Sequence, residues 1–162
     1  MRCIAVATAL AVSTLWLLPR AVRSEEVVKV GIVLPLSGPF AASGKQMLEG
    51  ARYYLRKNGD KVGNRRVELI ERDDGGVADA TRRLAQELIV NDKVDILSGF
   101  GLTPLAFAAA PLATQTKIPM IVMGAATSSV TERSPYVIRT SFAQGQSAAH
   151  EQERSERCSG PC

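Results

Sequence analysis

The pattern of apolar and polar positions changes period several times along the chain, between runs typical of buried strands and spacings typical of amphipathic helices. Residues Val28–Leu34 form a nearly continuous, mostly β-branched run, which is typical of a parallel strand covered on both faces. Glycines and prolines follow, and Met47, Ala51 and Leu55 then recur at helical spacing. The first unit of the chain is therefore expected to be a central strand, a glycine-rich turn and a helix.

The same order of strand and helix recurs along the rest of the chain. Further strands are expected at 66–72, 94–98, 119–123 and 136–140, and further helices at 77–90 and from Thr103 towards Gln115. This alternation predicts an α/β fold with a doubly wound parallel sheet, helices on both faces and right-handed crossovers. In such a Rossmann-like three-layer fold, ligands bind at the carboxyl ends of the strands.

Local signals refine where the helices begin and end. Ser43 and Gln46 have the spacing of a capping box at the first helix, and Thr103 before Pro104 predicts an N-cap with proline at the first helical position. Ser129 is expected to cap a further short helix. Pro111 is expected to kink the helix that contains it, or to end it early.

Both ends of the chain differ in character from its middle. Residues 1–24 have a short positive start, an apolar stretch and a small residue before Glu25, so we expect a signal peptide that is cleaved after Ser24. The apolar stretch is too short for a bilayer span, so an exported product with no stable membrane anchor is expected. Residues 147–162 have no apolar periodicity, which predicts a disordered tail or an aberrant one from another reading frame.

Charge and aromatic content exclude one class of partner. Three of the 20 basic residues lie in the leader, which leaves 17 against 16 acidic residues. The basic residues are dispersed and aromatic residues are scarce, so no nucleic acid partner is expected.

The residues needed for metal binding or covalent catalysis are concentrated in the tail. His150 is the only histidine, and after removal of the leader Cys158 and Cys162 are the only cysteines. These residues cannot supply a zinc site or a nucleophilic system to the domain. We therefore expect no metal site, no catalytic residue and no enzyme.

Two glycine-rich stretches bear on nucleotide binding. Residues 38–46 depart twice from the phosphate-loop motif, and residues 99–101 begin like a dinucleotide fingerprint that Pro104 interrupts. No cofactor is expected from these partial matches. A small secreted Rossmann-like enzyme that depends on a nucleotide stays open as an alternative function.

Small hydroxyl side chains follow three of the expected strands. They are Ser37 and Ser43, then Thr103, then Thr127 with Ser128. Each precedes a helix start, where free N–H groups and the positive end of the helix dipole favour an anion. Any one of them alone is more often a helix cap. Because the ends of central strands converge in this topology, the set together predicts a site for a small anionic or zwitterionic ligand.

Several segments in the same order resemble one protein family. The segments KVGIVLPLSGPFAASGKQMLEGARYYL, VDILSGFGL, AAAPLATQTKIPMIVMGAAT and YVIRTSF are similar to those of the leucine/isoleucine/valine-type periplasmic substrate-binding proteins of ABC transporters. The resemblance implies an extracytoplasmic receptor that delivers branched-chain amino acids, or a related small carboxylate or amide, to a membrane permease.

The resemblance also implies which residues bind the ligand. It places Thr103, Ala125 and Thr127 at the carboxylate and amine of the solute. Ser43 takes a position where amino-acid binders often have an aromatic side chain. The smaller residue would enlarge the pocket, so a bulkier aromatic acid or amide competes with leucine as the solute.

Members of this family have two lobes joined by a hinge, and they close on the ligand between them. By this resemblance residues 25–146 are expected to form most of the N-terminal ligand-binding lobe, and the fold is expected to be incomplete. Such a truncated chain is expected to bind solute weakly or not at all. A non-functional gene remnant is the other alternative.

Overall fold

The computed structural model describes residues 26–158. The expected signal peptide, residues 1–24, lies outside the described residues, and so do residues 159–162. One six-stranded sheet organises the described part, in the order β2-β3-β1-β4-β5-β6. Its strands are β1 (Glu26–Leu34), β2 (Lys61–Val62), β3 (Arg65–Asp73), β4 (Ile96–Gly99), β5 (Met120–Val122) and β6 (Val137–Arg139).

All strand pairs are parallel except that of β2 with β3. The expected doubly wound α/β fold is thereby confirmed. The sequence did not predict β2, a two-residue strand that pairs with the start of β3 after the turn at Gly63. A pair this short leaves no periodicity to detect.

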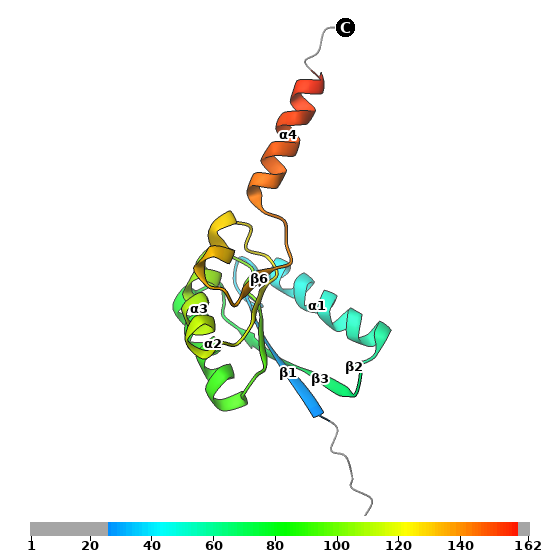
Figure 1. Cartoon of the computed structure of the whole chain (residues 1–162), viewed down its shortest axis with the longest axis vertical. Coiled ribbons are helices and arrows are strands. Elements are labelled where there is room, and N and C mark those ends of the chain that lie inside the picture. The colour runs from blue at the N-terminus through cyan, green and yellow to red at the C-terminus, as the bar shows by residue number, and fades with distance from the viewer. Residues whose placement is uncertain (1–25, 159–162) are drawn as a thin grey trace, which may run out of the picture.

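Helices cover the two faces of the sheet unequally (Figure 1). One face carries α2 (Ala78–Glu87), which continues as a π-helical turn (Leu88–Asp92), together with α3 (Thr103–Thr116) and a 3₁₀ helix, η3 (Ser128–Arg133). The other face carries α1 (Ala41–Asn58). Helix α4 (Gln144–Cys158) projects away from the sheet.

The larger core lies under α2 and α3. Val33, Leu97 and Val122 from three neighbouring strands are fully buried there against the alanine-rich side of α3. Burying a side chain of this size stabilises the fold by about 1.5–3 kcal/mol. On the α1 face, Ile32 and Leu34 pack with Leu48 in a smaller cluster. The alternation of side chains along β1 thus supplies both cores.

Two predicted helix caps were wrong, and one predicted early helix end does not occur. Helix α1 begins at Ala41, and Phe40 rather than Ser43 is its N-cap, because the alanines that precede Ser43 are strong helix formers. Leu102 rather than Thr103 precedes α3. Helix α3 continues through Pro111, which is exposed, as far as Thr116, so the helix does not end early at this proline.

One further predicted cap was wrong, and the C-terminal segment is helical. Thr127 rather than Ser129 is the N-cap of η3, and it makes no side-chain capping bond. The segment from Ser147, expected to be a disordered or an aberrant tail, continues helix α4 as far as Cys158. Glutamine, alanine, glutamate and arginine are good helix formers, so this segment is helical without an apolar face to pack.

Candidate functional site

Three strands end side by side at one edge of the sheet. Val33 in β1 is in register with Gly99 in β4, which is in register with Val122 in β5. Past these ends, the Phe100 N–H donates to the Val33 carbonyl at 2.9 Å, and the Met123 N–H donates to the Gly99 carbonyl at 2.7 Å. The turns after β1, β4 and β5 therefore start together.

The turns stay in contact beyond the strands. A Cβ atom on Gly124 would lie 2.7 Å from the Gly101 carbonyl oxygen and 2.9 Å from the Met47 methyl carbon. The Ala125 N–H donates to the Phe100 carbonyl at 3.2 Å. Only a residue without a side chain permits this approach of the β4 turn, the β5 turn and α1. We define this edge, where the three turns meet, as the rim.

Two hydroxyl groups meet at the rim. The Oγ1 atoms of Thr103 and Thr127 are 2.7 Å apart, and either can be the donor. Both residues are half-buried. Since one hydroxyl donates to the other, the pair keeps one donatable proton and several acceptor lone pairs. The N-terminal end of α3, with its free N–H groups, begins here as well. This arrangement can bind a small anionic group such as a carboxylate.

The other two predicted site residues are placed differently. Ala125 is buried beside Thr127. Ser43 is exposed in the first turn of α1, one turn before Met47 and on the same side of the helix. Within residues 26–158, no hydrogen bond joins Ser43 to Thr103 or Thr127. The structure thus brings the two threonines and Ala125 together and places Ser43 on the helix face that leads to them.

Asp73 clamps the turn that follows β1. Its Oδ1 atom accepts hydrogen bonds from the N–H groups of Leu36 at 2.8 Å, Gly75 at 2.9 Å and Ser37 at 3.2 Å. Partial desolvation raises the pKa of Asp73, but these backbone bonds and the Ser37 side chain outweigh it and hold the pKa below its ordinary value. The carboxylate is therefore ionised at neutral pH and fixes the turn.

The neighbouring carboxylate has a separate structural role. Asp74 is 3% exposed, and it accepts hydrogen bonds from the Thr81 hydroxyl at 2.8 Å and the Gly76 N–H at 2.9 Å. It thereby fixes the start of α2. The two adjacent carboxylates therefore have separate roles: Asp73 fixes the turn after β1, and the buried Asp74 fixes the start of α2.

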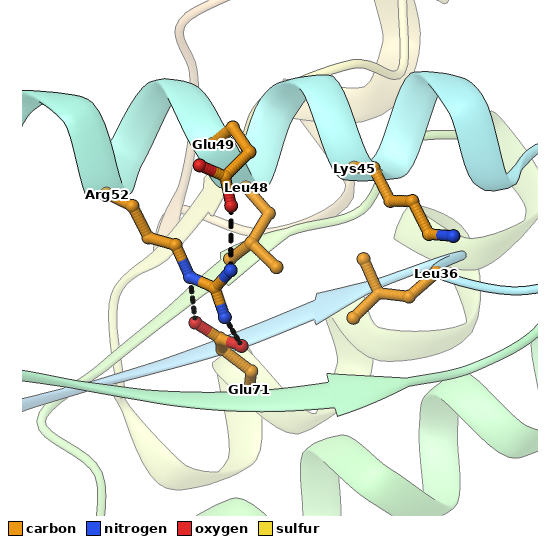
Figure 2. A pocket seen from close by; sticks show the side chains of 6 residues that line it. All are labelled: Leu36, Lys45, Leu48, Glu49, Arg52 and Glu71. Atoms are coloured by element: carbon orange, nitrogen blue, oxygen red, sulfur yellow. Dashed lines mark hydrogen bonds and ion pairs between the residues drawn. The ribbon is translucent and has the colours of Figure 1, made fainter.

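A cavity of about 330 Å³ lies between α1 and the strands beneath it. Figure 2 shows Arg52 reaching from α1 to Glu71 on β3, with bonds of 2.9 and 2.6 Å, and to Glu49 at 2.7 Å. The bond to Glu71 raises the pKa of Arg52, and the bond from Arg52 lowers the pKa of Glu49. The pair of Arg52 with Glu71 therefore connects α1 to β3 across this cavity.

A second, apolar groove of about 670 Å³ lies on the α1 face of the sheet. Ile32, Tyr54, Ile121 and Met123 contribute to its lining. Thr103, Ala125 and Thr127 line neither cavity. The binding capacity that we infer for the rim rests on its polar groups.

Sequence reasoning missed Asp73 and Met47 as neighbours of the site. Asp73 accepts hydrogen bonds from Leu36 and Ser37, which precede it by 37 and 36 positions in the chain. No spacing signal in the sequence marks contacts over such separations. The short spacing from Asp73 to Gly75 is typical of an Asx-turn and is the one local signal of its role. Met47 was identified only as part of the apolar helix face.

Within residues 26–158, no helix combines the length and apolar character that crossing a bilayer requires. No group of three or more His, Cys, Asp or Glu side chains in the same residues is arranged to hold a metal ion. Neither observation adds a further group to the chemistry of the rim.

Comparison with known proteins identifies relatives over most of the chain. Residues 27–151 match the model of a family described as periplasmic binding protein. A curated relative, Leu/Ile/Val-binding protein homolog 6 from Brucella abortus (strain 2308), is 47% identical over 124 residues, which are 76% of this chain and 32% of the relative. The chain spans about a third of the length of that relative.

Solved structures give the same result. A solute-binding protein of an ABC transporter from Rhodopseudomonas palustris BisB5, in complex with 3,4-dihydroxybenzoic acid, is 54% identical with a TM-score of 0.73, over 74% of this chain and 33% of that one. Another from R. palustris HaA2, in complex with p-hydroxybenzoic acid, is 41% identical with a TM-score of 0.79, over 83% of this chain and 37% of that one. These similar proteins are described as binding proteins and not as enzymes.

Proposed function

The chain belongs to the periplasmic binding proteins, and from this premise we propose that residues 25–146 form the first lobe of an extracytoplasmic solute receptor for an ABC importer. The observation that carries the proposal is the contact of the Thr103 and Thr127 hydroxyls at the rim. Solute-binding proteins with the same fold and 41–54% sequence identity support it.

The solute we propose is a small carboxylate. Branched-chain amino acids and their relatives fit the description of the curated relative, and aromatic acids fit the two solved structures. We favour an aromatic acid, because the 54%-identical protein binds one and because Ser43 leaves more room at the rim than an aromatic side chain would.

Each of the four residues has a proposed role in binding. The hydroxyls of Thr103 and Thr127 bind the carboxylate, and the buried Ala125, whose N–H donates to the Phe100 carbonyl, holds the turn that carries Thr127. Ser43, on the first turn of α1, faces the remainder of the solute. A carboxylate suits this arrangement because it accepts hydrogen bonds from hydroxyls and from the N–H groups at the start of α3.

The proposal also covers the export of the protein and the membrane partner to which it delivers solute. Residues 1–24 direct export to the periplasm and are removed after Ser24, and residues 147–162 lie beyond the lobe. An ABC permease receives the solute. If the proposal holds, genes for a permease and an ATPase lie next to the gene for this chain.

The solute class can be tested by titrating the ¹⁵N-labelled chain and following its amide signals. Because one lobe covers a solute from one side only, weak binding is expected, and NMR can measure it. We expect 4-hydroxybenzoate to bind about tenfold more tightly than 4-hydroxybenzyl alcohol, which lacks the carboxylate. Leucine serves as the second carboxylate. Binding of the alcohol as tight as that of the acid would contradict the proposal.

A further inference from the structure

Arg139 lies at the outer end of the row of residues that defines the rim. It is the last residue of β6 and is in register with Val122 of β5, which is in register with Gly99 of β4. Its side chain is half-buried, and its Nη1 atom donates a hydrogen bond of 2.8 Å to the carbonyl oxygen of Thr127.

No carboxylate accounts for the placement of this guanidinium. In the part of the chain that the structure describes, Arg139 forms no ion pair, whereas Arg72, the half-buried arginine of β3, pairs with Asp92 at 2.8 Å. The contact of Arg139 is with backbone. A hydrogen bond from a charged donor is stronger than one between neutral groups, so this contact restrains the Thr127 peptide group.

Thr127 is consequently held at both of its polar ends. Its hydroxyl contacts Thr103 at 2.7 Å, and its carbonyl accepts from Arg139 at 2.8 Å and from the Val130 N–H at 3.2 Å. The segment after β6 adds another restraint, because the Gln144 N–H donates to the Ala126 carbonyl at 2.9 Å. The orientation of the Thr127 hydroxyl thus depends on residues outside the rim.

We propose that Arg139 is a positioning residue for solute recognition, which fixes the Thr127 backbone so that the Thr127 hydroxyl faces Thr103. Arg139 acts on the solute only through Thr127. This inference rests on the proposed function for its consequence in binding, but the restraint on the loop exists without solute and can be measured separately.

The restraint is tested by amide hydrogen exchange of the whole chain without ligand. Arg139→Met removes the donor and keeps an unbranched side chain, Arg139→Lys keeps a charged donor, and Arg72→Met is the matched control on another strand. Relative to the Leu97 amide in the core, we expect Arg139→Met to speed exchange of the Ala125 and Val130 amides about fivefold or more. Arg139→Lys should restore much of the protection, and Arg72→Met should leave the ratio unchanged.

The consequence for binding is tested by a double-mutant cycle with 4-hydroxybenzoate. Arg139→Met should weaken binding about fivefold in the wild-type background and have no further effect in a Thr127→Val background. Unchanged exchange at Ala125 and Val130, or additive effects on binding, would overturn the inference. Faster exchange in a chain that binds 4-hydroxybenzyl alcohol as tightly as 4-hydroxybenzoate would support the positioning role while rejecting the proposed function.

Discussion

Thr103 and Thr127 are 24 residues apart in the chain, yet their hydroxyl oxygens are 2.7 Å apart. Neither hydroxyl caps the helix that begins beside it. Both side chains therefore direct their hydrogen bonding to each other and to the rim. The parallel strands thus bring together two hydroxyl groups that can form hydrogen bonds to a ligand.

Replacing either threonine by valine keeps the shape of the side chain and removes its hydroxyl. We expect Thr103→Val or Thr127→Val to lower the free energy of unfolding by about 1 kcal/mol, because the remaining hydroxyl loses its partner. Either change should also weaken binding of 4-hydroxybenzoate by about tenfold. Chemical denaturation and NMR titration measure the two effects.

Thr114→Val is the matched control for these variants. Thr114 is an exposed residue of α3 whose hydroxyl bonds its own helix at 3.4 Å. This change should leave binding as it is in the wild type. If all three valine variants bind alike, the hydroxyl pair has no role in recognition.

Two glycines of α1 should respond in opposite directions to alanine. A Cβ atom on Gly44 would collide with the backbone carbonyl of Pro35, whereas a Cβ atom on Gly50 would meet nothing within 4 Å. We expect Gly44→Ala to destabilise the fold by about 1–3 kcal/mol and Gly50→Ala to stabilise it by about 0.5–1 kcal/mol. Thermal and denaturant unfolding of both variants measures the difference. A stabilising effect at Gly44 would show that the turn after β1 does not approach the helix as described.

The carboxylate of Asp73 should give the stability a dependence on acid pH. Its pKa lies below the ordinary value in the folded chain, so its contribution is complete above about pH 4 and is lost as the pH falls through the folded pKa. Asp73→Asn should cost about 0.5–1 kcal/mol near pH 7, at the low end because the side chain is exposed, and less at pH 2.

Denaturation curves at several pH values, with Asp60→Asn as the control, test this pH dependence. Asp60 is an exposed carboxyl in the turn after α1. A loss of stability in Asp73→Asn that is equal at pH 2 and pH 7 would argue against an ionised clamp.

The parallel strands of the sheet, though not β2 or the strand order, could be predicted from the sequence because they depend on local patterns. The apolar run at Val28–Leu34 appears as β1, and the alternation of strands and helices implies that the turns after β4 and β5 lie side by side. Thr103 and Thr127 were identified on this ground, and the two residues do meet.

Other features of the site depend on contacts between distant residues and left no such pattern. Asp73 binds the turn after β1, and Arg139 binds the carbonyl group of Thr127. Both side chains form their hydrogen bonds with backbone groups. A sequence motif is made of side chains, so it cannot indicate a partner of this kind. The expected cap at Ser43 was misplaced because spacing alone does not decide between Ser43 and residues before it as the helix start.

The most direct test of the account is to locate a bound carboxylate on the chain. Intermolecular nuclear Overhauser effects between the ring protons of 4-hydroxybenzoate and the chain would do so. The account predicts contacts with the methyl groups of Thr103 and Thr127. Contacts confined to the apolar groove, at Tyr54 and Ile121, with none at the two threonines, would contradict it.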